Sequence, residues 1–431
     1  MAVKANKPAV RHLRPHAVST RMRVRGRSVA RRTFHSLGNS AYRRFWVSLI
    51  VLMAGVNMQM LARGQLAWEL TNDTFMVALV GSAFAPPILI FSVFGGAFAD
   101  RWDRKKMIQY SQLAICCIAG LVGFAIYTGV ISIWILMLAG FAQGMGWSFM
   151  MPARQSIIPQ LVSKSEITNA IALSASGMAL MTLSGPGLGG LAYAWIGPAN
   201  TYFLITGLMF IAFLMMSGVT VTGEAVSKSR REEKVLSAVW EGLRYSARNR
   251  TILILFVLLL ATTMTSMSFR SLMPAQVDLI FGGGPTELGI LMSMIGVGAL
   301  LGSLFIAGLT ENVQRGVVLL VCTGLSAAAI LVSTFVAFFF IAMFAMMVLG
   351  LGDAGRRSLN ASMLMEQADE DHRGRVMGIY MLNFGLTPIG AIPLGILAEA
   401  TDIRVAFAVA GIVLAVAVLL TWVLTPRIRN L

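Results

Sequence analysis

Long apolar segments alternate with short polar ones along most of the chain. No Asp, Glu, Lys or Arg lies between Arg250 and Arg270, and none lies between Arg315 and Asp353. A helix needs about 20 apolar residues to cross the hydrocarbon core of a bilayer. The pattern therefore predicts twelve membrane-spanning helices, with ends accurate to about three residues. They run near Phe45–Trp68, Met76–Phe98, Met107–Thr128, Ser132–Met151, Ile167–Ile196, Thr201–Thr222, Ile252–Met273, Leu288–Leu309, Val317–Ser333, Phe338–Gly355, Met377–Leu397 and Val405–Leu424.

The longest polar segment inside the chain divides these helices six plus six. It begins at Gly223 and ends at Arg250, and apolar residues recur in it at helical spacing (Val235, Leu236, Val239, Trp240 and Leu243). This spacing predicts an amphipathic helix that lies on the membrane surface. We therefore expect an all-α polytopic membrane protein, made of a basic tail (1–44), a six-helix bundle (45–222), a linker (223–250), a second six-helix bundle (251–425) and a short tail (426–431).

Charged residues set the expected orientation. Only 13% of the residues are charged, against about a quarter in soluble proteins. Lys and Arg concentrate in alternate loops, such as Arg101–Lys106, while the opposite loops carry Glu69, Asp73, Asp278, Glu287, Glu399 and Asp402. Cytoplasmic loops carry the excess of Lys and Arg, so we expect both termini in the cytoplasm. Topology then explains the net charge of +16, and no nucleic-acid partner is expected.

The first 44 residues are rich in arginine and contain no acid. We expect this tail to be disordered and to lie on anionic lipid. Its composition also resembles a mitochondrial transit peptide, which is Arg-rich and acid-poor, and a start assigned too far upstream is a further alternative.

The sequence contains few residues suited to binding a metal or cofactor or to catalysing a reaction. Cys116, Cys117 and Cys322 all lie in apolar segments, where free cysteine packs as a small hydrophobe. The four histidines lie in polar tail or loop segments, and no phosphate-binding GxxxxGK[ST] loop occurs. We therefore expect no metal, no cofactor, no nucleotide-driven pump and no enzyme, although a membrane enzyme or a non-transporting receptor of the same fold stays as an alternative.

The two halves repeat weakly. Gly95–Asp100 at the end of the second predicted span matches Ile306–Glu311 at the end of the eighth, and Arg104 then corresponds to Arg315. Gly144–Gly146 likewise matches Gly350–Gly352. Internal repeats around a midplane site are typical of secondary transporters. Chance similarity between helices rich in Gly and Ala is the alternative.

The loop after the second span carries the strongest motif, Gly96-Ala97-Phe98-Ala99-Asp100-Arg101-Trp102-Asp103-Arg104-Lys105-Lys106. It resembles the G-x-L-A-D-R-x-G-R-K signature of the major facilitator superfamily, with Asp103 in place of the second Gly. The resemblance implies that Asp100 meets the N-terminus of span 11, where a carboxylate is favoured, and closes the cytoplasmic side. It also implies contacts of Arg104–Lys106 with the acidic loop from Glu366 to Asp371. The expected cytoplasmic gate comprises Gly96, Asp100, Arg101, Arg104, Lys105, Glu311 and Arg315.

The fifth span carries a second motif, formed by Gly177, Gly185, Pro186, Gly189 and Gly190. It resembles the antiporter motif G-x-x-x-G-P-x-x-G-G of the same superfamily, with Met181 in place of one Gly. In that superfamily the motif marks exporters. The alternative is a packing face, because small residues let helices approach closely.

Further motifs narrow the resemblance. Met151–Gln155, Ile158–Val162, Asn169–Leu173 and Arg373–Gly378 are similar to the drug:proton antiporter branch that includes macrolide-efflux and enterobactin-export proteins. The resemblance implies an exporter of small amphiphilic or hydrophobic compounds, of drug or siderophore type. It also implies proton antiport with alternating access, in a monomer in the cell membrane. Export of a metabolite or lipid without proton coupling is the alternative.

In this superfamily spans 1, 4, 7 and 10 line the substrate path. Buried charge in a membrane is costly and indicates function, so Arg63 is the leading candidate, for an anionic group. Its alternatives are a position at the outer interface or a pair with Glu69. Span 1 contains no deep acid, so proton coupling is expected to use Asp100, Glu69 or Asp353. The candidates on the path are Asn57, Gln59, Arg63, Gln143, Trp147, Thr262, Ser266 and Asp353, with Arg270 nearer a helix end and Arg154 at the end of span 4.

Overall fold

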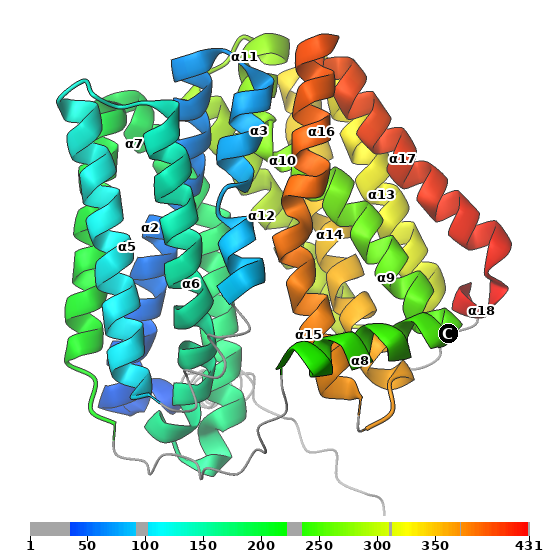
Figure 1. The fold of residues 1–431 in the computed structure, drawn as a ribbon, viewed down its shortest axis with the longest axis horizontal. Coiled ribbons are helices and arrows are strands. Elements are labelled where there is room, and N and C mark those ends of the chain that lie inside the picture. Colours follow the sequence, from blue (N-terminus) through cyan, green and yellow to red (C-terminus); the bar gives the residue numbers. More distant parts are fainter. Residues whose placement is uncertain (1–34, 92–101, 222–234, 310–312, 371, 430–431) are drawn as a thin grey trace, which may run out of the picture.

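The computed structural model describes residues 35–91, 102–221, 235–309, 313–370 and 372–429. Within these ranges the chain consists of helices joined by short turns. Figure 1 shows two groups of helices side by side, the first coloured blue to green and the second green to red. The predicted fold class, an all-helical polytopic membrane protein of two bundles, is confirmed.

The described helices follow the predicted order. The first bundle contains η1 (His35–Gly38), α2 (Ser40–Thr71), α3 (Thr74–Ser82), α5 (Arg104–Tyr127), α6 (Ile133–Leu161), η2 (Lys164–Glu166) and α7 (Ile167–Ser217). The linker carries α8 (Val235–Arg248). The second bundle contains α9 (Arg250–Thr262), η3 (Thr263–Met267), α10 (Ser268–Ser271), α11 (Met273–Phe281), α12 (Pro285–Ala307), α13 (Arg315–Phe335), α14 (Phe339–Gln367), α15 (Arg373–Leu382), η4 (Asn383–Leu386), α16 (Thr387–Ala400), α17 (Ile403–Leu424) and α18 (Pro426–Arg429).

Twelve membrane crossings follow from eleven long apolar helical segments in the described ranges, because one segment crosses twice. The segment Lys164–Ser217 has 54 residues. As one straight α-helix it would be about 80 Å long, far longer than a bilayer is thick. Gly197, with φ 78° and ψ 170°, breaks it into two helices. The predicted division between Ile196 and Thr201 is therefore correct.

Two helices extend well beyond their predicted ends. The fourth span was predicted to end at Met151, but α6 continues to Leu161. The tenth was predicted to end at Gly355, but α14 continues to Gln367. Hydropathy marks where the apolar surface ends, whereas a helix continues as long as its backbone stays hydrogen-bonded. Charged residues that follow the predicted ends, such as Arg154 and Arg356, therefore lie on helices.

Capping residues explain where several helices begin. The Asn39 side chain accepts hydrogen bonds from the backbone N–H groups of Ala41 and Tyr42 at the start of α2. Asp103 does the same for Lys105 and Lys106 at the start of α5. Asp is among the best N-cap residues. The acid that departs from the superfamily signature thus has a local structural role.

The segment before the first bundle packs against that bundle. His35 Nδ1 lies 2.7 Å from Glu166 Oε1, and Ser36 Oγ donates to Asn169 Oδ1 over 2.8 Å. The prediction of a disordered tail is therefore wrong for residues 35–44, and residues 1–34 lie outside the described ranges.

The linker helix predicted from the apolar spacing is present as α8. Its Glu241 carboxylate lies 3.0 Å from Arg375 Nη1 of α15. The Tyr245 hydroxyl donates to Asp369 Oδ2 over 2.9 Å, and its ring stacks on His372. The linker thus docks on the start of the eleventh span.

The two bundles are joined by side-chain hydrogen bonds at one end of the molecule. We call this end, which carries the α2–α3 turn at Asn72 and lies at the top of Figure 1, the Asn72 end, and the opposite end, where α5 begins, the Arg104 end. At the Asn72 end Trp68 Nε1 donates to Asp278 Oδ2 over 2.9 Å, and Thr74 Oγ1 donates to Glu399 Oε2 over 3.1 Å. At the Arg104 end Arg104 Nη1 donates to the Ser156 carbonyl within the first bundle. Two hydrogen bonds between side chains thus join the bundles at the Asn72 end.

Candidate functional site

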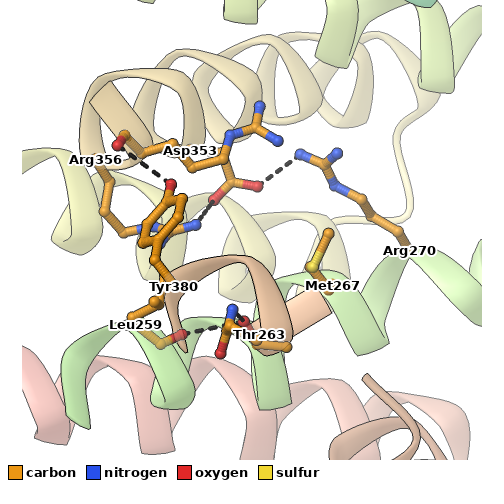
Figure 2. Close-up of a pocket in the computed structure, with 9 residues that line it drawn as sticks. Leu259, Thr263, Met267, Arg270, Asp353, Arg356 and Tyr380 are labelled. Atoms are coloured by element: carbon orange, nitrogen blue, oxygen red, sulfur yellow. Dashed lines mark hydrogen bonds and ion pairs between the residues drawn. The ribbon is translucent and has the colours of Figure 1, made fainter. Parts of the chain in front are cut away.

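A buried carboxylate organises the centre of the second bundle. Asp353 of α14 is 2% exposed. Its Oδ2 atom accepts from Ser266 Oγ at 2.9 Å and from Arg270 Nη2 at 2.6 Å. Its Oδ1 atom accepts from Ser326 Oγ at 3.3 Å and lies 3.8 Å from Arg356 Nη2. Three spans thus converge on one acid, as Figure 2 shows for the two arginines.

A small cavity of about 10 Å³, the space of about one water molecule, lies beside this carboxylate. It is lined by residues of spans 7, 10 and 11: Leu259, Thr263, Met267, Arg270, Asp353, Arg356, Arg357, Tyr380 and Asn383. Asp353, Arg356 and Arg357 share one face of α14, because residues three and four positions apart are neighbours on a helix. The lining therefore combines three guanidinium groups with one carboxylate.

The seventh span changes its helical geometry at this pocket. Residues Thr263–Met267 form a π-helical turn, η3, between α9 and α10. Such turns occur as single insertions in α-helices, frequently at functional sites. Thr263 and Met267 both line the pocket, and Arg270 follows one turn later. The irregular turn thus lies directly against the charged cluster.

The first bundle buries an arginine without a carboxylate. Arg63 Nη1 donates to Gln143 Oε1 over 2.9 Å, and Gln143 Nε2 donates to Gln59 Oε1 over 2.7 Å. The Arg63 guanidinium also lies over the Phe84 ring, 5.7 Å from its centroid. Glu69 instead accepts from the Tyr193 hydroxyl at 2.6 Å. Neither the expected Glu69 partner nor a position at the outer interface is found for Arg63, which is buried.

Arg154 is a second buried arginine of the first bundle. Its Nη2 atom lies 3.5 Å from Ser48 Oγ, and its guanidinium lies over the Phe45 ring, 5.5 Å from the centroid. Its Nε and Nη1 atoms have no hydrogen-bond partner among the described residues. Arg154 therefore packs against α2 rather than standing in a loop.

The remaining predicted path residues are not brought together. Asn57 Nδ2 donates to the Met53 carbonyl, and Thr262 Oγ1 donates to the Leu259 carbonyl, so both polar groups bond to their own helix. Trp147 packs at the edge of the hydrophobic core. Five of the predicted residues lie in contact, Gln59, Arg63 and Gln143 in the first bundle and Ser266 and Asp353 in the second. Their role on a substrate path stays a prediction. The sequence-based prediction did not include Arg356, Arg357, Tyr380 or Asn383. A tenth helix that is extended past Gly355 would have placed the two arginines on the same helix face as Asp353.

The motif of the fifth span forms close helix contacts. A Cβ atom on Gly177 would lie 3.0 Å from Ile50 Cγ1, and one on Gly189 would lie 2.9 Å from Met58 Cα, both on α2. A Cβ atom on Gly185 would lie 2.6 Å from Asn57 Cβ. Gly190 packs across the bundle boundary, against the Pro285 carbonyl of α12. The motif therefore packs α7 against both bundles, and its link to export stays a prediction.

The predicted gate is only partly described. Gly96, Asp100, Arg101 and Glu311 lie outside the described residues. Lys105 Nζ donates to the Ser217 carbonyl over 2.9 Å. Arg315 Nη1 pairs with Glu366 Oε1 at 2.5 Å within the second bundle. Glu366, which was expected to meet Arg104–Lys106, thus has a different cation beside it.

Two similar six-helix bundles with charged groups buried among their spans define a secondary-transporter architecture. The family model described as transmembrane secretion effector, of the major facilitator superfamily, matches residues 31–429. The chain belongs to this family, as the motifs predicted.

Characterised relatives cover most of the chain. It is 22% identical to the staphyloferrin A transporter of Staphylococcus aureus, over 79% of this chain and 85% of the relative. It is 26% identical to the multidrug efflux pump Tap of Mycolicibacterium fortuitum, over 83% and 88%. It is 27% identical to the enterobactin exporter EntS of Citrobacter koseri, over 89% and 90%. The predicted resemblance to drug-efflux and siderophore-export proteins is confirmed.

Solved structures share the fold. A crystal structure of the nucleoside transporter NupG superimposes with a TM-score of 0.72 at 13% identity, covering 89% of this chain and 99% of NupG. At this identity the likeness concerns the fold alone.

Proposed function

We propose that this protein exports small amphiphilic molecules of drug or siderophore type across the cell membrane, as a monomer that works by alternating access. The observation that carries the proposal is the contact between the bundles at the Asn72 end, where the side chains of Trp68 and Thr74 donate hydrogen bonds to Asp278 and Glu399 of the second bundle. The family and its relatives support export as the direction.

The distribution of cations supports the sidedness of this proposal. Arg104, Lys105 and Lys106 lie at the start of α5, Arg248 ends α8 and Arg250 begins α9, all at the Arg104 end. Cytoplasmic loops carry the excess of Lys and Arg, so the Arg104 end and both termini face the cytoplasm. The bundles are then joined at the external end, and a molecule enters the path from the cytoplasm.

Proton antiport is the driving reaction that we propose, with Asp353 as the proton carrier. Among the described residues, Asp353 is the carboxylate side chain that is buried inside the spans. Protonation removes its charge and with it the ion pair to Arg270, whose side chain is then free to reorient. A carboxylate whose charge controls a contact between spans is a two-state element of the kind that alternating access requires.

Export without proton coupling is a second candidate, favoured by one observation. Asp353 lies beside both Arg270 and Arg356. Losing its charge would leave the neighbouring guanidinium groups without a counter-ion inside the membrane, which is costly. If Asp353 stays ionised through the cycle, the membrane gradient of another species must drive export.

Flux of a lipophilic dye in reconstituted vesicles tests these proposals. With an imposed pH gradient, we expect the parent protein to move dye and Asp353→Asn to lose the dependence on the gradient. Glu370→Gln is the matched control, because it makes the same acid-to-amide change on a side chain that is 89% exposed. Flux that is identical with and without the gradient would establish the second candidate. Absence of flux in correctly inserted protein would contradict export altogether.

A further inference from the structure

We infer that the pocket formed by Arg270, Arg356 and Arg357 binds an anionic group of the transported molecule, a carboxylate or a similar oxyanion. The inference deepens the proposed export function and rests on it for the role of the bound molecule as a substrate. The site itself is defined by the charges and the unused hydrogen-bond donors around Asp353.

The pocket contains more positive than negative charge. Three arginines line it, and Asp353 is the acid among its described lining residues. Arginine stays protonated in proteins, so two positive charges are left uncompensated when Asp353 is ionised. Isolated charge within a membrane is costly, and such residues pair with an opposite charge or face a substrate path. A second anion beside Asp353 would balance the cluster.

The donors for this anion are already in place. Arg356 is 4% exposed, and its Nε and Nη1 atoms have no hydrogen-bond partner among the described residues. The Nε atom of Arg270 also has none there. The Asp353 oxygens are already occupied by Ser266, Ser326 and the Nη2 atoms of the two arginines. The unused guanidinium edges therefore need a different acceptor.

The geometry of arginine favours an oxyanion. A guanidinium group presents its N–H donors as a planar fork that matches the two oxygens of a carboxylate or phosphate. Tyr380 and Asn383 complete the lining with one hydroxyl and one amide, groups that orient a bound oxygen but carry no charge. The aliphatic side chains of Leu259 and Met267 lie in the same lining and suit an apolar part of the same molecule. The lining thus has the composition expected for an amphiphilic anion, but its cavity of about 10 Å³ holds only a water-sized group. A whole anion therefore binds only when the surrounding side chains move apart.

The first bundle extends the positive charge of the interior. Arg63 and Arg154 are buried there, and the contacts of both are to uncharged side chains. The charged residues buried in the described spans are thus Arg63, Arg154, Arg356 and Asp353. This field attracts anions and repels cationic compounds along the path.

Binding measurements on the purified full-length protein test the site independently of transport. Citrate, salicylate and inorganic phosphate serve as anionic probes, and tetraphenylphosphonium serves as a lipophilic cation, each titrated by calorimetry in neutral detergent. We expect at least one anion to bind, and Arg356→Gln or Arg357→Gln to weaken it about tenfold or more, since hydrogen bonds to charged groups are the stronger class. Arg356→Lys should recover only part, because it keeps the charge and loses the fork.

Arg373→Gln is the matched control, since this arginine lies on α15 outside the pocket and its side chain is 45% exposed. It should bind the anions as the parent protein does. Arg357→Gln keeps the test decisive if Arg356→Gln fails to fold, because Arg357 is only partly buried. Anion binding that the pocket variants leave unchanged, or no anion binding in protein that still exports dye, would overturn the inference. Dye export that fails while anion binding persists would instead contradict the proposed function alone.

A lipid headgroup offers the same oxyanion chemistry, and a competition arm separates the two sources. Parent protein in nanodiscs of phosphatidylcholine, with or without phosphatidylglycerol, is titrated with the bound anion. Equal affinity in both nanodiscs supports a substrate site. Loss of anion binding in the presence of phosphatidylglycerol would assign the pocket to lipid and overturn the inference.

Discussion

The two bundles treat buried arginine differently. In each bundle an arginine of the first span bonds to a side chain of the fourth: Arg63 to Gln143, and Arg270 to Asp353. An amide and an aromatic ring contact Arg63, and both are uncharged. The partner of Arg270 is a carboxylate, whose charge a proton can remove. The first bundle thus holds its arginine with a partner whose charge does not change, whereas protonation can neutralise the partner of the arginine in the second bundle.

The different partners of Arg63 and Arg270 should have their largest effect on the free energy of unfolding. Asp353→Leu leaves Arg270 and Arg356 without their carboxylate, and removing one member of a buried ion pair costs about 3–5 kcal/mol. Gln143→Leu, the corresponding change in the first bundle, removes an uncharged partner and is expected to cost about 1–3 kcal/mol. Thermal unfolding of the two purified variants measures both losses. Equal losses would mean that the carboxylate and the amide play the same role.

A medium effect is expected where the bundles touch. Gly190→Ala places a Cβ atom against the Pro285 carbonyl, and overpacking a close contact costs about 1–3 kcal/mol. The change should shift the population toward a state opened at the Asn72 end, since about 1.4 kcal/mol is a tenfold change in an equilibrium. Spin labels at Asn200 and Thr401, in a cysteine-free background, report the separation of the bundles.

The control for that experiment is Gly207→Ala, because a Cβ atom on Gly207 meets nothing within 4 Å. It should leave the distance distribution unchanged. A distribution in Gly190→Ala that matches this control would show that the glycine contact does not hold the Asn72 end closed.

The smallest effect concerns the third span of each bundle. Asp103 caps α5, whereas Gln314 precedes α13 and makes no capping hydrogen bond with its side chain. Asp103→Gly, which restores the signature residue, should cost only a few tenths of a kcal/mol. Gln314→Asp should stabilise the protein by about 1 kcal/mol if it forms the missing cap. Melting temperatures compare the two, and a loss in Gln314→Asp would contradict this account.

Hydropathy was sufficient to predict the twelve spans, their division into two bundles and the break near Gly197, because membrane crossing depends on a long apolar surface. It did not predict where α14 ends. Arg356 and Arg357 therefore fell outside the predicted tenth span, and the charged pocket was missed. The polar groups of Asn57 and Thr262 bond to carbonyls of their own helices. Whether a polar side chain in a span turns to its own backbone or to a cavity depends on packing, which a single sequence does not reveal.

One residue keeps the number of crossings even. Gly197 turns the chain with φ 78° and ψ 170°, a conformation essentially restricted to glycine. Without this reversal, α7 would run on as one rod, and every later helix would insert upside down relative to the first bundle. The arginines of the linker would then lie on the opposite face of the bilayer from Arg104. A residue far from the charged pocket thus determines which compartment that pocket can face.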